Sequence, residues 1–128
     1  MKSLENVKLI RQGFYIELAT KYGIMESILL DLIFYWVNYN EEHCIMSHYK
    51  NGRFWFYATN KWFETQLPFT TYRTISRKLH RLEDLDLIKL SNYNKLGYDR
   101  TQWITLTDTG LYEMQNIHFK YMEQKTKK

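Results

Sequence analysis

Residues 68–90 read PFTTYRTISRKLHRLEDLDLIKL, and they are the most informative part of the sequence about its fold. Within it Ile75, Leu79 and Leu82 are spaced i, i+4 and i+7, which places them on one stripe of an α-helix. The other side of that helix carries arginine and lysine side chains, and no acidic residue occurs between positions 70 and 82. Such a helix packs against a core by its apolar stripe and presents positive charge on its outer face.

Two short helices with a tight turn between them are predicted around Pro68. Thr59 is a good N-cap for a helix over residues 60–66, because its hydroxyl can accept a hydrogen bond from a free N–H of the first turn. Pro68 ends that helix, and Thr70 is predicted to cap the next one, over residues 71–84. Two helices in this order form a helix-turn-helix.

A two-stranded hairpin is predicted after the second helix. Asp86 is expected in the left-handed conformation that ends many helices. Apolar and β-branched residues predict strands over residues 87–91 and 101–106, joined by a polar turn over residues 92–98. A helix-turn-helix followed by such a hairpin, with a basic outer face, is typical of a winged helix-turn-helix, which presents a recognition helix and a wing to DNA.

A buried helix and a second hairpin are predicted in the N-terminal half. Residues 24–38 are apolar nearly all round a helix, which is typical of a helix at the centre of a core. Asn51 and Gly52 form the dipeptide most typical of a hairpin turn, and they lie between two segments with strand character. We interpret residues 1–13 as a polar arm and residues 14–18 as a short extended segment.

The expected fold class is α+β, a winged helix-turn-helix with an extra N-terminal hairpin and a C-terminal helix. The 128 residues are enough for a single domain with one core. We assign the winged-helix core to residues 24–106, the terminal helix to residues 107–124 and a basic tail to residues 125–128. The terminal helix, capped by Thr107 or Asp108, has an apolar stripe that either covers the core or pairs with the same stripe of a second copy. The stripe consists of Leu111, Met114, Ile117, His118 and Tyr121.

Composition and charge indicate in which compartment the protein is found more clearly than they indicate its binding partner. The net charge of +4 and the pI of about 9.1 are compatible with a polyanionic partner and equally with an ordinary soluble protein. The single cysteine, Cys44, cannot form an internal disulfide, which is typical of a reducing compartment. The N-terminus is polar, and the longest apolar run, residues 28–37, is too short to span a bilayer. We therefore expect a cytoplasmic protein without a membrane segment.

The sequence has no pattern that is typical of an enzyme or a metal site. It contains no glycine-rich phosphate loop, no nucleophile elbow and no pair of catalytic acids. His43 and Cys44 are adjacent, so they would point apart on a strand, and no second pair of cysteines or histidines has the spacing of a zinc site. We expect no catalytic residue, no metal and no cofactor.

A series of short motifs occurs in one order between residues 24 and 106. A Gly-Arg-x-Trp segment is followed by a tryptophan in the short helix, by Pro-Phe, by Thr-Ile in the second helix, and by a wing rich in asparagine and tyrosine. This order resembles the N-terminal winged-helix domain of replication-initiation and replisome-organiser proteins from phages and mobile elements of low-GC Gram-positive bacteria. The matching residues are Gly52, Arg53, Trp55, Thr59, Trp62, Pro68, Phe69, Thr74, Ile75, Asn92, Tyr93, Asn94, Asp99, Thr101 and Trp103.

The resemblance implies a winged helix of phage or mobile-element origin that binds double-stranded DNA. It implies a replication role less directly, because those proteins usually continue into a second domain that binds single strands, a helicase or a helicase loader. Here one helix and a basic tail follow the matched stretch. Stand-alone domains of this kind are often regulators, and phages also reuse small folds as inhibitors of host machinery.

The second helix contains most of the residues that we predict to contact DNA. Its first turn is nearest to the bases, and the rest of its basic face is nearest to phosphates. The expected base-proximal residues are Thr71, Tyr72, Arg73 and Ser76, and the expected phosphate contacts are Arg73, Arg77, Lys78 and Arg81. The alternative is a charged helix face that is merely solvated.

In the wing, Lys95 and Arg100 are predicted to contact the DNA backbone or an adjacent groove, and Tyr93 is a candidate for stacking on a base. The alternative for these residues is a solvated turn. The four tryptophans lie on core-facing stripes, so we expect them to pack in the protein and not on bases. They are Trp36, Trp55, Trp62 and Trp103.

Two functions from different classes follow from these patterns. The first is a duplex-DNA-binding protein that acts in replication initiation or transcriptional regulation, with residues 107–124 as the candidate surface for a homodimer. The alternative is a protein-interaction module that uses its winged helix to bind a host or phage protein, such as an inhibitor of a host defence nuclease. Salt separates them, because binding to phosphates releases counterions and weakens steeply as the salt concentration rises.

Overall fold

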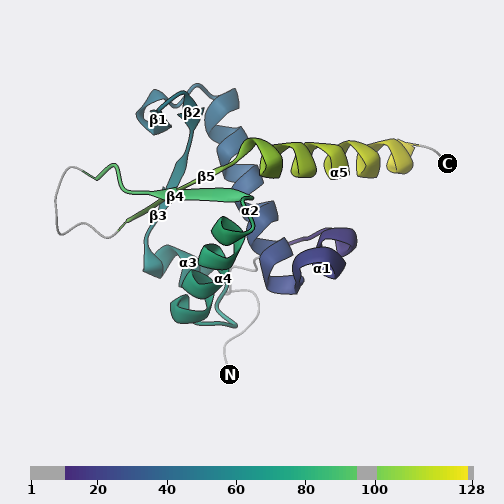
Figure 1. The fold of residues 1–128 in the computed structure, drawn as a ribbon, viewed down its shortest axis with the longest axis horizontal. Coiled ribbons are helices and arrows are strands. Elements are labelled where there is room, and N and C mark those ends of the chain that lie inside the picture. Colours follow the sequence, from purple (N-terminus) through teal and green to yellow (C-terminus); the bar gives the residue numbers. More distant parts are fainter. Residues whose placement is uncertain (1–10, 95–100, 127–128) are drawn as a thin grey trace, which may run out of the picture.

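The computed structural model describes residues 11–94 and 101–126, which form an α+β fold of five α-helices and two small antiparallel sheets (Figure 1). The helices are α1 (Ile16–Tyr22), α2 (Ile24–Glu42), α3 (Asn60–Gln66), α4 (Tyr72–Asp84) and α5 (Asp108–Thr126). The strands are β1 (Tyr49–Lys50), β2 (Arg53–Phe54), β3 (Phe56–Ala58), β4 (Ile88–Ser91) and β5 (Gln102–Leu106), and a 3-10 turn, Met46–His48, precedes β1. The predicted α+β class is confirmed.

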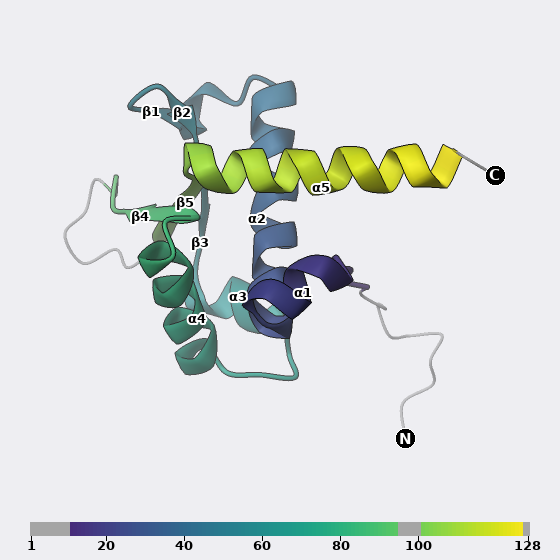
Figure 2. The same cartoon turned by 45° about the vertical axis from the view of Figure 1, so that its right-hand side comes forward.

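Helix α2 is the central element, and most of the other elements pack against it (Figures 1 and 2). It begins where predicted and ends at Glu42 instead of residue 38. Leu29 and Ile33 are fully buried, as expected for the centre of a core. The helix is not buried all round, however, because Tyr35 and Tyr39 are exposed on its other side.

A helix replaces the extended segment that the sequence suggested for residues 14–18. Apolar residues at alternate positions have the spacing of a strand, but Leu18 is buried whereas Ile16 is 77% exposed. The carbonyl of Tyr15 accepts a hydrogen bond from the N–H of Ala19 at 3.0 Å, which begins α1. The extended interpretation was wrong for residues 16–18, because Leu18 packs in the core as part of a helix, together with Tyr22 of the same helix.

The hairpin at Asn51-Gly52 forms as predicted, but the strand after it is shorter than expected. Both turn residues have a positive φ, 51° and 75°, which suits a tight hairpin turn. Trp55 lies between the end of β2 and the start of β3. Its backbone N–H donates to the carbonyl of His48 at 2.8 Å, and its indole N–H donates to the carbonyl of Lys50 at 2.9 Å. The chain therefore enters a different sheet at the next residue.

Strand β5 is the middle strand of the second sheet, whose order is β3-β5-β4, and both pairings are antiparallel. Ile104 on β5 is fully buried and pairs with Phe56 on one side and Leu90 on the other. This row faces the core. Asp86, just before β4, has the predicted left-handed conformation, with φ of 60°.

Helices α3 and α4 are joined by a tight turn, and both begin at a threonine cap. The hydroxyl of Thr59 accepts a hydrogen bond from the first turn of α3 at 3.1 Å, as predicted. The cap of α4 is Thr71, not Thr70: the Thr71 hydroxyl accepts from the N–H of Thr74 at 3.4 Å. The N–H of Thr70 instead donates to the carbonyl of Leu67 at 3.2 Å, so Thr70 belongs to the turn.

Helix α5 starts on the core, and its C-terminal part extends beyond the rest of the molecule (Figures 1 and 2). Thr107 is its cap, because the Thr107 hydroxyl accepts a hydrogen bond from the N–H of Gly110 at 3.0 Å. Met114 is buried, and Leu111 and Ile117 pack against the same core. The stripe was expected either to cover the core or to pair with a second copy. These three residues cover the core of their own chain.

Candidate nucleic-acid interface

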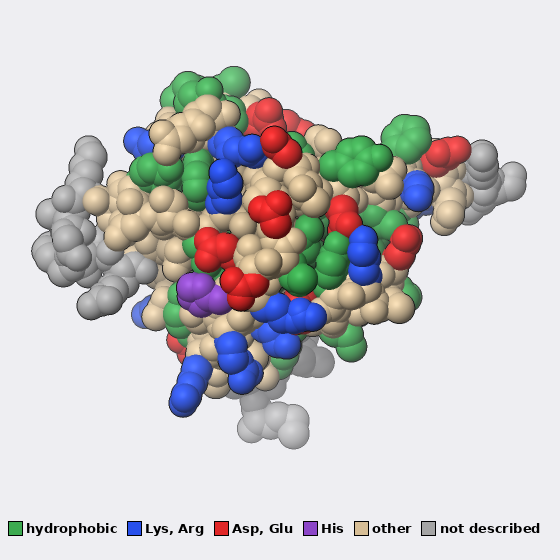
Figure 3. All heavy atoms as spheres, in the orientation of Figure 1, with side chains coloured by type: hydrophobic (Ala, Val, Ile, Leu, Met, Phe, Trp, Pro, Cys, Tyr) green, Lys and Arg blue, Asp and Glu red, His purple; other side chains and the backbone are tan. Residues whose placement is uncertain are grey.

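Helix α4 presents the basic face on which the DNA-binding prediction depends. Ile75 and Leu79 are 0% and 1% exposed, while Arg73 and Arg77 are exposed. The helix phase predicted from the sequence is therefore confirmed. Figure 3 shows lysine and arginine side chains gathered over the lower part of the molecule, where α4 lies in Figure 1.

Two of the four basic residues on α4 are paired with a buried carboxylate. Glu26, in the first turn of α2, is only 3% exposed. One of its oxygens, Oε2, lies 3.2 Å from Nζ of Lys78 and 3.1 Å from Nε of Arg81. A buried charge is strongly unfavourable unless it is paired, so these contacts both satisfy Glu26 and hold α4 against α2. One signal of this pairing is visible in the sequence, a carboxylate inside a helix predicted to be buried.

The other two basic residues are open to solvent. Among the described residues, Arg73 and Arg77 have no ion-pair partner. The C-terminal end of α4 is different, because Glu83 and Asp84 follow there and Glu83 lies 3.9 Å from His80. The available positive charge is thus concentrated in the N-terminal half of α4. In a recognition helix, that half is the one that meets the bases.

Tyr72 and Ser76 are less available for base contacts than the sequence suggested. Both are half-buried, and the ring of Tyr72 packs against Phe63 with 6.0 Å between ring centroids. Burial raises the pKa of the Tyr72 hydroxyl, although a hydrogen bond with Ser76 acts in the opposite direction. The hydroxyl of Thr71 is engaged in capping. Of the four base-proximal residues, Arg73 is therefore the best placed to reach a base edge.

The base of the predicted wing is fixed by the β1–β2 hairpin. The Tyr93 hydroxyl accepts a hydrogen bond from the side-chain amide of Asn51 at 2.6 Å. The ring of Tyr93 lies edge-on to Trp55 and Trp103, with centroids 5.2 and 5.4 Å away. The indole N–H of Trp103 donates to the side chain of Asn94 at 2.8 Å. Tyr93 is thus half-buried and in contact with two rings of the protein, and its base-stacking role stays a prediction.

The four tryptophans lie in the protein interior or at its edge, whereas Lys95 and Arg100 of the predicted wing tip lie outside the described residues. Trp55 and Trp103 are buried, as predicted, and pack in the protein. Trp36 and Trp62 are partly buried against the same core.

Comparisons with known proteins found no match. The chain matches no family model, no curated protein and no solved structure. Within residues 11–94 and 101–126, no group of three or more histidine, cysteine or acidic side chains is arranged to hold a metal ion. No helix in those ranges is long and apolar enough to cross a bilayer. The geometry and charge of α4 therefore carry the functional inference.

Proposed function

We propose that this chain is a winged helix-turn-helix protein that binds double-stranded DNA. In this proposal α3 and α4 form the helix-turn-helix, α4 enters the major groove as the recognition helix, and β4 and β5 form the stem of the wing. The observation that carries the proposal is the exposed pair Arg73 and Arg77, which lies on α4 opposite the fully buried Ile75 and Leu79. A helix anchored in this way presents its charges to a phosphate backbone in a fixed position.

The basic residues of α4 have different roles in this proposal. Arg73 is in the first turn, where it can donate two hydrogen bonds to the major-groove edge of a guanine. Arg77 is one turn farther along and contacts a phosphate. Lys78 and Arg81, which the sequence placed beside phosphates, pair with Glu26 and contribute mainly to the position of α4.

The biological setting is proposed from the resemblance to replisome-organiser domains. We place the protein in the cytoplasm of a bacterium that carries the phage or mobile element, where it acts without catalysis in replication initiation or transcriptional regulation. Lys95 and Arg100 of the wing then contact the DNA backbone beside the recognition helix.

The test is a selection of duplexes followed by titration. Duplexes enriched from a random pool by the purified chain are compared with scrambled duplexes at two salt concentrations. We expect tighter binding to the enriched duplex, and a loss of affinity for both duplexes as salt rises, with a slope of about −0.9 for each phosphate contacted. The proposal is rejected if no duplex is enriched and neither duplex binds.

A protein-interaction module is the second candidate, and the charge distribution around α4 favours it in one respect. Glu26 neutralises part of the basic face, and Asp84 and Asp86 are exposed at its end. A short basic surface beside an acidic one suits a protein partner as well as DNA. In this case the α3–α4 unit binds a host or phage protein, such as a defence nuclease, and the titrations show no salt-sensitive binding to DNA.

A further inference from the structure

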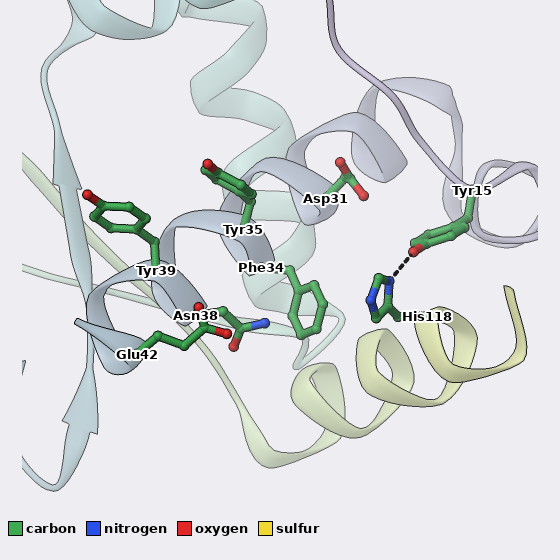
Figure 4. A pocket seen from close by; sticks show the side chains of 8 residues that line it. All are labelled: Tyr15, Asp31, Phe34, Tyr35, Asn38, Tyr39, Glu42 and His118. Carbon is green, nitrogen blue, oxygen red and sulfur yellow. Dashed lines mark hydrogen bonds between the residues drawn. The ribbon is translucent and has the colours of Figure 1, made fainter. Parts of the chain in front are cut away.

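An open pocket lined by aromatic rings lies between α1, α2 and α5 (Figure 4). Its volume is about 420 Å³, and the rings of Tyr15, Phe34, Tyr35 and Tyr39 form much of its lining. We call it the aromatic pocket. The α2 residues that line it recur every three or four positions, whereas most of the buried residues of α2 lie on the other side of the helix. The pocket is therefore on the side of α2 turned away from α4.

Two rings of the aromatic pocket, Tyr35 and Tyr39, contact each other and two rings that lie beside the pocket, Trp36 and His43. Tyr35, Tyr39 and the C-cap residue of α2, His43, follow at intervals of four residues, and their rings stack with centroids 6.5 and 4.1 Å apart. Trp36 lies edge-on to both tyrosines, at 5.1 and 5.5 Å. Tyr35 is nevertheless 59% exposed. A concentration of exposed rings in a concave site is typical of an interaction surface.

The aromatic pocket is also acidic. Its two carboxylates, Asp31 and Glu42, lie toward opposite ends (Figure 4), and no lysine or arginine is among the described residues that line it. Asp31 is half-buried and accepts a hydrogen bond from the amide of Gln12 at 3.3 Å. Burial raises the pKa of Asp31, although His118 acts in the opposite direction. A carboxylate partly removed from water is stabilised by a cation, and a partner can supply one.

We infer that the aromatic pocket binds a basic segment of a protein partner, whose lysine or arginine side chains lie along the rings and pair with Asp31 and Glu42. Long basic side chains suit this site, because their stems pack on apolar surface and their charged ends interact favourably with ring faces. Asp31 and Glu42 are 11 positions apart on α2, which corresponds to about 16 Å along the helix. Two cations at about that spacing in one segment engage both carboxylates.

This inference does not rest on DNA binding by α4. The two surfaces are on opposite sides of α2, so a protein segment and a duplex can be bound at the same time. A polyanion is excluded from the aromatic pocket by its carboxylates. If both surfaces are used, the protein brings a basic partner to the DNA site.

The experiment selects peptides from a random library displayed on phage, using the full chain as bait. We expect the enriched peptides to be rich in lysine or arginine next to apolar residues. The strongest peptide is then titrated into the parent chain and into the double variant Asp31→Asn, Glu42→Gln. Loss of both carboxylates should weaken binding by roughly tenfold or more, since each removes a charge-assisted contact.

Two control variants test whether peptide binding depends on the carboxylates of the aromatic pocket. Glu64→Gln removes an exposed carboxylate on α3, away from the pocket, and should bind the peptide as the parent does. Arg77→Ala should also leave peptide binding unchanged, whatever it does to DNA. Thermal unfolding checks each variant, and Glu42→Gln alone, at an exposed position, replaces the double variant if Asp31→Asn does not fold.

Three outcomes overturn the inference. The first is that no peptide is enriched, or that the enriched peptides lack basic residues. The second is that a basic peptide binds the parent and the folded carboxylate variants equally. The third is self-association of the parent that is lost in the same variants, since this would identify a second copy of the chain as the occupant.

Discussion

The carboxylate of Glu26 lies 3.1 Å from Nε of Arg81, although the two residues come from different helices, α2 and α4. The same oxygen contacts Lys78 at 3.2 Å. One buried acid thus fixes the outer helix of the proposed helix-turn-helix to the central helix. It also divides the basic face of α4 into two paired cations and two, Arg73 and Arg77, that have no ion-pair partner in the part of the chain that the structure describes.

Glu26→Gln should release Lys78 and Arg81 from this pairing. Glutamine has nearly the same shape but no charge, and both cations are exposed enough to turn toward solvent. We expect tighter binding to all duplexes alike and a salt slope that is steeper by about one for each released cation that reaches a phosphate. Titrations at two salt concentrations measure both quantities. Adding Arg81→Ala to this variant should remove part of the gain, and an unchanged slope in Glu26→Gln would contradict the pairing argument.

Arg73→Ala and Arg77→Ala should weaken DNA binding in different ways. Loss of Arg73 should cost roughly 1–3 kcal/mol on the preferred duplex and relax discrimination there, because it reads a base edge in the first turn of α4. Loss of Arg77 should weaken binding to preferred and scrambled duplexes equally and lower the salt slope by about one. The same titrations distinguish the two patterns. If both variants bind the two duplexes as the parent does, α4 is not a recognition helix.

Local periodicity explains which elements the sequence predicted well. The stripe Ile75, Leu79 and Leu82 lies within one helix, so its burial follows from spacing alone. The pairing of Glu26 with Arg81 joins residues far apart in the sequence, and no local pattern specifies such a contact. The α1 helix was missed because seven residues are too few to distinguish the two periods, and only packing against α2 decides between them.

The aromatic contacts of the proposed wing also join residues far apart in the sequence, so no local pattern predicts them. Asn51 and Tyr93 could each be recognised as turn residues, but not as partners of one another. Their contact depends on how the β1–β2 hairpin folds over the second sheet, which follows from the exit of Trp55 from that hairpin. A base-stacking role for Tyr93 was reasonable for an isolated turn. That role stays a prediction for a half-buried ring with two tryptophan neighbours.

Gly110→Ala should destabilise the fold. A Cβ atom at this position would lie 2.0 Å from the carbonyl oxygen of Leu87, which also accepts the N–H of Thr107 at 3.1 Å. Backbone must move to relieve this overlap, so we expect a loss of about 1–3 kcal/mol in the free energy of unfolding, measured with urea. Gly13→Ala is the matched control, because no atom lies within 4 Å of its added Cβ. Equal stability of the two variants would disprove the close approach of α5 to Leu87.

The contact between α5 and α1 should make stability depend on acid pH. Glu113 accepts hydrogen bonds from Lys21 at 2.6 Å and from the Tyr22 hydroxyl at 2.5 Å. Burial raises the pKa of Glu113, but these two hydrogen bonds outweigh it and hold the pKa below its ordinary value of 4.5. Because the pKa is lower in the folded state, the stabilisation is complete above the unfolded value and is lost as the pH falls through the folded value.

The thermal midpoint of the parent should therefore fall more steeply than that of Glu113→Gln as the pH is lowered from about 5 to about 3. At neutral pH the variant should be the less stable of the two, because it lacks the charged contact. Glu64→Gln, which removes an exposed acid, should follow the parent. Parallel profiles for the parent and Glu113→Gln would rule out this contact as a source of acid sensitivity.

A homodimer through α5, if the proposed DNA site is palindromic, requires residues other than those first expected. Met114 is 1% exposed in the single chain, so Met114→Asp should unfold the protein instead of yielding a folded monomer. Tyr112 and Phe119 are 70% and 68% exposed and lie seven residues apart, on one outer face of the helix. We predict that this face forms the dimer and that Phe119→Asp yields a monomer with the thermal midpoint of the parent and weaker binding to a palindromic duplex. Sedimentation velocity measures the change in mass, and a parent chain that sediments as a monomer at every concentration would exclude the dimer.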